Sequence, residues 1–364
     1  MKKQPINELY FIRAIACMSV VGIHSLTMLV SHHTLPQTTV QIARTLQMIL
    51  LFATPMFILI SEFILSYAYP DKLPKGFYKK RFMFIFLPYI MMALVYSFYY
   101  NSIGSNTIKG FMDISLHNLL QASWHGYFIV IIFQFYFLHT FYNKFLSKTN
   151  PWLIVSFSFV INVVYLYIFS FIEPPVNNLQ NAEEIWYGYS RLPFLGWIFY
   201  FSIAYYGGRN IPLFKEKLQK YRYALMLLVF FAAGYVLYNY HSGTLQIVSS
   251  RRIDILIYTV ILYVLLFQLT SKLKKAPNFI LQISRYSFAI YLLHPLVQLL
   301  TNDLLPDNMN IILYTTIQFT MGIVISILLS MLLNRLPIGF AFIGKLGKVP
   351  SYSSYKTNEL ENAS

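Results

Sequence analysis

Long apolar stretches separated by short polar segments make up most of the chain. A helix needs roughly 20 residues to cross a lipid bilayer, and these stretches are of about that length. The spans that we expect lie at residues 9–30, 42–68, 82–100, 124–142, 152–172, 193–208, 222–240, 253–271, 279–300 and 311–333. The pattern therefore predicts an all-α, polytopic membrane helical bundle of about ten transmembrane helices, and an even number of spans places both termini on one side.

The composition agrees with a chain that is mostly dissolved in lipid. Hydrophobic residues make up 57% of the sequence and charged residues 11%, whereas soluble domains carry roughly 25% charged residues. The first apolar stretch is too long for a cleavable signal peptide, so we interpret it as a retained first span. A single cysteine, Cys17, cannot build a disulfide framework or a cysteine metal site, and we expect no metal.

The basic residues predict the orientation of the bundle. With the amino terminus inside, 21 of the 28 lysines and arginines fall in cytoplasmic segments, and only Lys109, Arg191, Arg251 and Arg252 fall outside. The positive-inside rule therefore favours cytoplasmic termini. These residues lie in short clusters between apolar runs, so the net charge of +15 reflects topology and does not indicate nucleic-acid binding.

One membrane domain accounts for nearly all of the chain. We expect it to cover residues 1–345, followed by a polar, disordered cytoplasmic tail over residues 346–364. The third span contains Pro88, which should kink it, because proline cannot donate the backbone hydrogen bond that a helix requires at that position.

Charged side chains within the spans point to a functional site, since each costs at least about 2.5–3.5 kcal/mol on insertion scales. In the first span, Arg13 and His24 are separated by about three helical turns, so they lie on one face roughly 16 Å apart. This face offers a permanent cation and, deeper in the membrane, a titratable imidazole. The alternative is an arginine that reaches the inner headgroups and a histidine that is merely hydrogen-bonded in the bundle.

The ninth span repeats this arrangement. It places Arg285 about 9 Å and His294 about 22 Å beyond its cytoplasmic start, at 1.5 Å per residue. His24 reaches the same depth in the first span, so we expect the two histidines to share a cavity. Pro295, directly after His294, should open the helix locally.

Glu62 in the second span is predicted at the depth of Arg13 and Arg285. One carboxylate against two guanidinium groups would leave a positively charged pocket on the cytoplasmic side, suited to an anionic ligand such as a nucleotide phosphate. The alternative is a buried ion pair that only fixes helix packing.

The aromatic segment from Trp124 to His139 has a simpler interpretation. Trp124 and Tyr127 are typical of interfacial anchors, and we expect His139 near the inner headgroups. Within the whole chain, the sequence contains neither a phosphate-binding glycine loop, nor a GxSxG elbow, nor an HExxH helix.

Four segments together resemble the acyltransferase-3 family of membrane O-acyltransferases. They are the Arg-x10-His of the first span, TPMFILISEF (residues 54–63), KKRFMFIFLPY (79–89) and SRYSFAIYLLHP (284–295). The resemblance covers nearly all of the chain. The segments WHGYFIVIIFQF (124–135) and LGWIFYF (195–201) resemble the branch that contains intercellular adhesion protein C of staphylococcal polysaccharide synthesis.

This resemblance implies an enzyme that carries acyl groups from cytoplasmic acyl-CoA to carbohydrates, lipids or peptidoglycan at the outer face. The family's functional pair maps to Arg13 and His24. Many members have Ser-Gly in the second-span motif where this chain has Ser61 and Glu62. A family role that requires the close backbone approach that glycine allows at this position is therefore not expected for Glu62. Many members also append an extracellular esterase-like domain, and only a short tail follows the last span here.

We therefore expect a multi-pass cell-membrane acyltransferase without a cofactor. It would use acyl-CoA, with acetyl as the acyl group, and a hydroxyl of a cell-surface carbohydrate or glycolipid as acceptor, and it would work beside membrane lipid and other polysaccharide enzymes. His24 is the expected general base or acyl carrier, and His294 or Tyr291 would assist proton transfer. Ser61, Glu62, Tyr291 and Arg285 are the expected substrate-binding residues. The competing function is a polysaccharide exporter or flippase without acyl transfer.

Overall fold

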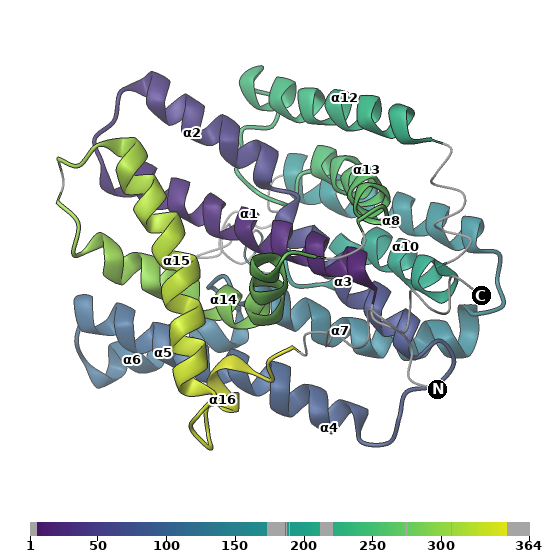
Figure 1. Cartoon of the computed structure of the whole chain (residues 1–364), viewed down its shortest axis with the longest axis horizontal. Coiled ribbons are helices and arrows are strands. Elements are labelled where there is room, and N and C mark those ends of the chain that lie inside the picture. Colours follow the sequence, from purple (N-terminus) through teal and green to yellow (C-terminus); the bar gives the residue numbers. More distant parts are fainter. Residues whose placement is uncertain are drawn as a thin grey trace.

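The computed structural model describes residues 6–172, 186, 188, 190–211, 221–273, 276–306 and 308–347, and this part of the chain is all-helical. Figure 1 shows a bundle of helices in which α1 crosses the centre. The main helices are α1 (Asn7–His32), α2 (Gln37–Leu50), α3 (Ala53–Ala68), α4 (Phe77–Arg81), α5 (Leu87–Ile103), α6 (Ile108–Leu120), α7 (Tyr127–Phe141), α8 (Pro151–Phe171), α10 (Ile198–Arg209), α12 (Arg222–His241), α13 (Ile253–Thr270), α14 (Asn278–Asn302), α15 (Ile311–Leu333) and α16 (Phe340–Ile343).

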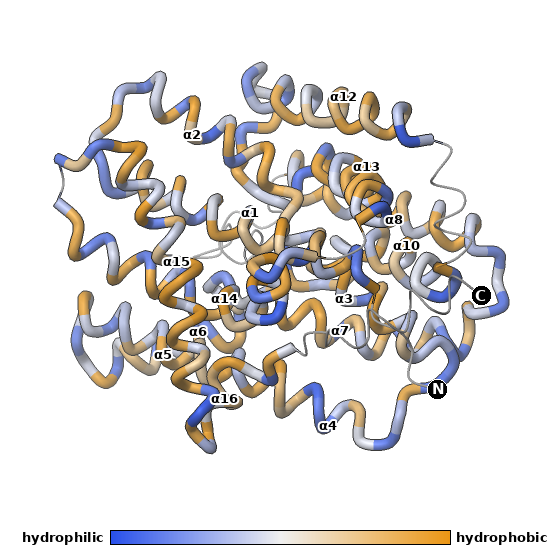
Figure 2. Tube along the Cα trace, viewed as in Figure 1, coloured by the Kyte–Doolittle hydropathy of each residue, from blue (hydrophilic) through white to orange (hydrophobic). Residues whose placement is uncertain are grey.

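Helices occur at all ten predicted places, and the described part of the chain has eight that are long and apolar enough to cross a membrane. The two others are α10 and α14. With the preceding turn η3 (Phe194–Trp197), α10 is still short, and α14 is long but carries more polar residues. Because α14 is buried over most of its length, its polar residues Ser284, Ser287, His294 and Gln298 lie inside the bundle. Figure 2 shows hydrophobic residues along the helices and hydrophilic ones mainly at helix ends and connections.

Two segments depart from straight helices. The predicted second span is broken at Leu51 and Phe52 into α2 and α3. Before α5 the chain forms a π-helical turn, η1 (Phe82–Phe86), and Pro88 follows in the first turn of α5. Proline lacks the backbone N–H that would continue the regular bonding pattern, which explains the irregularity predicted at Pro88.

Helix α6 lies between the predicted spans 82–100 and 124–142, where the sequence analysis predicts no helix. It folds back antiparallel along α5, where the Tyr89 hydroxyl donates to the carbonyl oxygens of Asn118 (2.8 Å) and Leu119 (3.0 Å). The Asn118 amide donates to the Ser97 hydroxyl at 2.9 Å. Its outer face has an exposed apolar stripe with a spacing of four residues, made of Ile108, Met112, Leu116 and Leu120.

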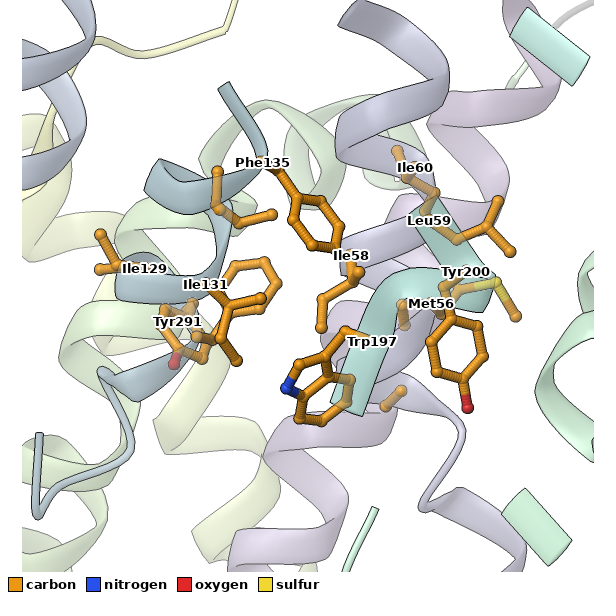
Figure 3. Close-up of a cluster of buried hydrophobic side chains, with 14 of the residues drawn as sticks. Met56, Ile58, Leu59, Ile60, Ile129, Ile131, Phe135, Trp197, Tyr200 and Tyr291 are labelled. Atoms are coloured by element: carbon orange, nitrogen blue, oxygen red, sulfur yellow. The ribbon is translucent and has the colours of Figure 1, made fainter. Parts of the chain in front are cut away.

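The core lies between α3, α7 and α10, with α1 and α14 beside them. Figure 3 shows side chains from these elements packed together, among them Ile58 of α3, Phe135 of α7 and Trp197 of η3. By contrast, α12 buries only Val236 and Asn239, so it lies at the periphery of the bundle, beside α2 and α13 in Figure 1.

Both ends of the described chain lie on one side of the bundle. Arg13 near the start of α1 and Leu346 after α16 line the same cavity. The backbone N–H of Gly347 donates to the Arg285 carbonyl oxygen at 3.4 Å. Leu346 and Gly347 are thus placed, whereas the rest of the predicted tail and much of the connections over 173–192 and 209–221 lie outside the described residues.

Candidate active site

Three histidine rings meet at the centre of the site. The ring centroids of His24 and His294 are 5.0 Å apart, and His125 lies 6.2 Å from His24 and 5.8 Å from His294. His294 is fully buried, whereas His24 and His125 are each partly exposed. His125 and His294 each have a buried Nε2 atom with no hydrogen-bond partner among the described residues.

Two glutamines hold the turn of α1 that carries His24. From α2, the Gln47 side-chain amide donates to the Ile23 carbonyl at 3.0 Å and to the Thr27 hydroxyl at 2.8 Å. From α14, the Gln298 amide donates to the Val21 carbonyl at 3.2 Å and to the Ser25 hydroxyl at 2.8 Å. Both glutamines are fully buried, so these bonds fix the backbone on either side of His24.

His294 lies inside the continuous helix α14, directly before Pro295. Tyr96 of α5 inserts its hydroxyl at this point, donating to the Leu292 carbonyl and accepting from the Leu296 N–H, each at 3.0 Å. These two groups would bond each other in a regular helix, so the hydroxyl bridges the opened turn. The local opening predicted from Pro295 is confirmed, and Nδ1 of His294 lies 2.7 Å from the Ile290 carbonyl oxygen.

His125 arrives through the turn between α6 and α7. Because α6 runs back along α5, the residues after it return toward the middle of the bundle, and His125 packs against Tyr96 and Trp124. Gly126 is required here, since a Cβ atom would lie 2.2 Å from the Trp124 ring. Arg191 donates to the carbonyl oxygens of Gln121 and Ala122 at 3.2 and 2.9 Å. These bonds give two backbone acceptors of the turn a hydrogen-bond partner.

A cavity of about 510 Å³ lies on the side of the chain termini. Its described lining has five basic residues and no carboxylate. The basic residues are Arg13 of α1, Lys80 and Arg81 of α4, Arg285 of α14, and Lys345 after α16. Ser61, Ser284 and Ser287 supply hydroxyl groups, and Phe57, Phe128 and Tyr291 form an aromatic wall. We call this cavity the basic pocket.

Tyr291 connects the basic pocket to the histidines. It lines the pocket, its hydroxyl donates to the His125 carbonyl, and its ring lies 5.4 Å from that of His125 and 6.4 Å from that of His294. Figure 3 shows Tyr291 beside Ile129 and Ile131 of α7. The pocket and the histidine cluster are thus separated by a single layer of aromatic side chains.

Glu62 has a different position from the one predicted. Its carboxylate accepts hydrogen bonds from His139 (2.7 Å) and Ser66 (2.8 Å), and no ion pair joins it to Arg13 or Arg285. Ser61, the preceding residue on α3, lines the basic pocket, whereas Glu62 points away from it, about 100° around the helix. The predicted pairing with an arginine is therefore wrong, whereas the position of His139 near the headgroups stays a prediction. Among the described residues, no carboxylate forms an ion pair with Arg13 or Arg285.

The sequence interpretation missed two further residues. His125 was passed over within an aromatic segment interpreted as an interfacial belt, and Tyr96 had no motif of its own. The spacing of four residues in the apolar stripe of α6 was a signal for an extra helix, and a helix that returns would have moved His125 inward. Among the described residues, no group of three His, Cys, Asp or Glu side chains is arranged to hold a metal ion.

Comparison with known proteins settles the family. Residues 6–335 match the model of the acyltransferase domain family, acyltransferase-3. The chain belongs to this family. It is an integral membrane O-acyltransferase, since the match spans nearly all of the helical bundle.

Relatives of two names align with almost the whole acyltransferase chain. A Bacillus subtilis protein named "Putative membrane-bound acyltransferase YfiQ" is 35% identical over 94% of this chain and 95% of its own. A Staphylococcus aureus protein named "Probable poly-beta-1,6-N-acetyl-D-glucosamine export protein" is 29% identical over 96% of this chain and 97% of its own. A Staphylococcus epidermidis protein of the same name is 28% identical over 98% and 99%. No solved structure matches the chain.

Losing the Tyr96 hydroxyl should disturb the site without changing its aromatic packing. In Tyr96→Phe the ring keeps its contacts with Trp124 and His125, but the Leu292 carbonyl and the Leu296 N–H lose their partner, which costs about 1–3 kcal/mol when such groups are buried. We expect a lower unfolding midpoint in detergent and at least about a tenfold loss of acyl transfer.

The matched control is Tyr100→Phe, which removes a hydroxyl one turn further along α5 on a more exposed ring. It should change neither the midpoint nor the activity. Normal activity of Tyr96→Phe would mean that the helix turn at Pro295 holds His294 in place without this hydroxyl.

Proposed function

We propose that the protein transfers an acetyl group from acetyl-CoA on the cytoplasmic side to a hydroxyl of a cell-surface carbohydrate or glycolipid. The observation that carries this proposal is the order of the two sites. A pocket lined with cations opens on the side of the termini, and its inner wall contacts the histidine cluster through Tyr291. The cell membrane is the proposed location.

The basic pocket suits the charge of the proposed donor. Coenzyme A carries a 3′-phosphate and a pyrophosphate, and five basic side chains without a carboxylate provide charge-assisted hydrogen bonds for such groups. Arg13 and Arg285 are the lining cations closest to the histidines along their helices, by 11 residues from Arg13 to His24 and by nine from Arg285 to His294. The serines and Tyr291 supply neutral hydrogen bonds between these charges.

His24 fits the role of general base. The acceptor oxygen attacks the thioester carbonyl while His24 takes its proton; the carbon–sulfur bond breaks, and the proton passes to the departing thiolate of coenzyme A. In the other route, a neutral His24 nitrogen attacks the thioester carbonyl, the carbon–sulfur bond breaks and coenzyme A leaves as the thiolate. The acceptor hydroxyl then attacks the acyl-imidazole, which releases His24, and the hydroxyl proton passes to the thiolate. His125 and His294 surround His24 and can orient its ring or relay the proton.

Export of a polysaccharide is the second candidate, because the staphylococcal relatives are named export proteins. Purified protein in lipid, supplied with acetyl-CoA labelled in the acetyl group and a carbohydrate acceptor, separates the two functions. Our proposal expects ester-linked label on the acceptor. Movement of an unmodified polysaccharide across the bilayer, with no label transferred, would support export instead.

A further inference from the structure

A buried polar network lies behind the wall of the basic pocket, where α3, α7 and α10 end on that side. It begins at Glu62, which is 1% exposed. One carboxylate oxygen is bonded to His139 and Ser66, and the other is buried without a partner among the described residues. A carboxylate inside a membrane bundle is costly, so its partners indicate what it supports.

His139 of α7 links Glu62 of α3 to the rest of the network. Its Nε2 lies 3.0 Å from the Asn143 amide nitrogen and 3.1 Å from the carbonyl oxygen of Tyr69. The side-chain oxygen of Asn143 accepts from the Tyr205 hydroxyl at 2.7 Å and from Arg209 at 3.1 Å. These two donors fix the Asn143 amide so that its nitrogen donates to Nε2 of His139, while Nδ1 donates to Glu62. The imidazole is thereby held beside the backbone of Tyr69.

Arg209 at the end of α10 completes the network. Its Nη1 donates to the Pro70 carbonyl and to the Tyr205 hydroxyl. Its ion pair with Asp71, at 3.7 Å, adds little because the Asp71 side chain is 87% exposed. Arg209 reaches this place because α10 approaches α3 closely: a Cβ atom on Gly208 would lie 2.4 Å from the Phe63 carbonyl oxygen.

The network therefore contacts the connection between α3 and α4 on the side that faces away from the basic pocket. Tyr69 and Pro74 of this connection line the basic pocket, and Phe77 with Lys80 and Arg81 continues the same wall. Glu62, His139, Asn143 and Arg209 themselves do not line the pocket. Their hydrogen bonds reach the pocket wall at residues 69–76, through Arg209 and the Pro70 carbonyl oxygen.

We propose that the Glu62–His139–Asn143–Arg209 network is the positioning device of the basic pocket. It fixes residues 69–76 and the two α4 cations that follow them, and thereby sets the affinity for the anionic donor, while it takes no part in the transfer step. The donor in this statement rests on the proposed function; the anchoring of residues 69–76 does not. If the network only stabilised helix packing, substitutions in it would lower protein abundance or stability without selectively changing donor binding.

Arg209→Met tests the network at its link to the Pro70 carbonyl. A bond to a charged donor is lost, so we expect the KM for acetyl-CoA to rise by about tenfold, with kcat at saturating donor within about twofold of the normal value. Hydrogen exchange of the amides over residues 71–76 should become faster. His139→Gln should act in the same direction and serves as the second variant if Arg209→Met fails to accumulate.

Lys148→Met is the matched control, since it removes an exposed cation on the same side of the bundle. It should leave both KM and exchange unchanged. The proposal is overturned if the Arg209 and His139 variants lower kcat at an unchanged KM, or if exchange over 71–76 does not change. If the unsubstituted protein transfers no acetyl group at all, the proposed function fails, but the exchange experiment still decides whether the network anchors the connection.

Discussion

The His24→Ala protein should accumulate in the membrane at its normal level and transfer no measurable acyl group. His24 is a partly exposed member of the three-histidine cluster, and the backbone around it is held by Gln47 and Gln298, so loss of the imidazole leaves the helix packing in place. A general base contributes about 10²–10⁴-fold to a rate, and an essential acyl carrier contributes more. The measurement is acylation of surface carbohydrate in cells at matched protein level.

His32→Ala is the control on the same helix. His32 is exposed at the end of α1 and makes one long contact, 3.4 Å, to Asn302. This variant should acylate normally. Near-normal acylation by His24→Ala would remove His24 from the mechanism and bring the exporter interpretation forward.

Neutralising the deep cations of the basic pocket should weaken donor binding strongly. We expect Arg13→Gln and Arg285→Gln each to raise the KM for acetyl-CoA by about tenfold to a hundredfold, since each removes a charge-assisted bond to a phosphate or the acyl carbonyl. No carboxylate in the described lining compensates either guanidinium group. Steady-state kinetics with acetyl-CoA as the varied substrate measures this effect.

Arg335→Gln is the control that removes one positive charge without removing a contact in the basic pocket. Arg335 is exposed after α15 and does not line the pocket. It should change the KM little. If it raises the KM as much as Arg13→Gln does, the pocket acts through net charge at the membrane surface and not through specific contacts.

Periodicity and charge were sufficient to predict the helices, but not how the outer connection folds. Apolar length predicts a span because every backbone group in lipid must bond within its own helix. The same rule says nothing about a segment such as α6, which is amphipathic and packs along α5. Because α6 was not predicted, His125 was expected at the membrane interface. Its true position depends on how α6 leads the chain back toward the middle of the bundle.

Depth along a helix predicted the meeting of His24 and His294, because rise per residue is nearly constant. Depth alone could not predict the partner of Glu62. Three charges at one level can face different neighbours, and the choice depends on rotation of α3: Ser61 faces the basic pocket and Glu62 faces His139. That rotation is set by packing against α7 and α10, which a single sequence does not reveal.

The central claim is that an acyl group passes from a donor on the side of the termini to an acceptor on the other side. Sealed vesicles with the cytoplasmic face outward test it directly: labelled acetyl-CoA is added outside, and the carbohydrate acceptor is enclosed. We predict ester-linked label on the enclosed acceptor, and none with the His24→Ala protein. Label found only when donor and acceptor share one side, or an enclosed acceptor that stays unlabelled while the protein binds acetyl-CoA, would contradict the account.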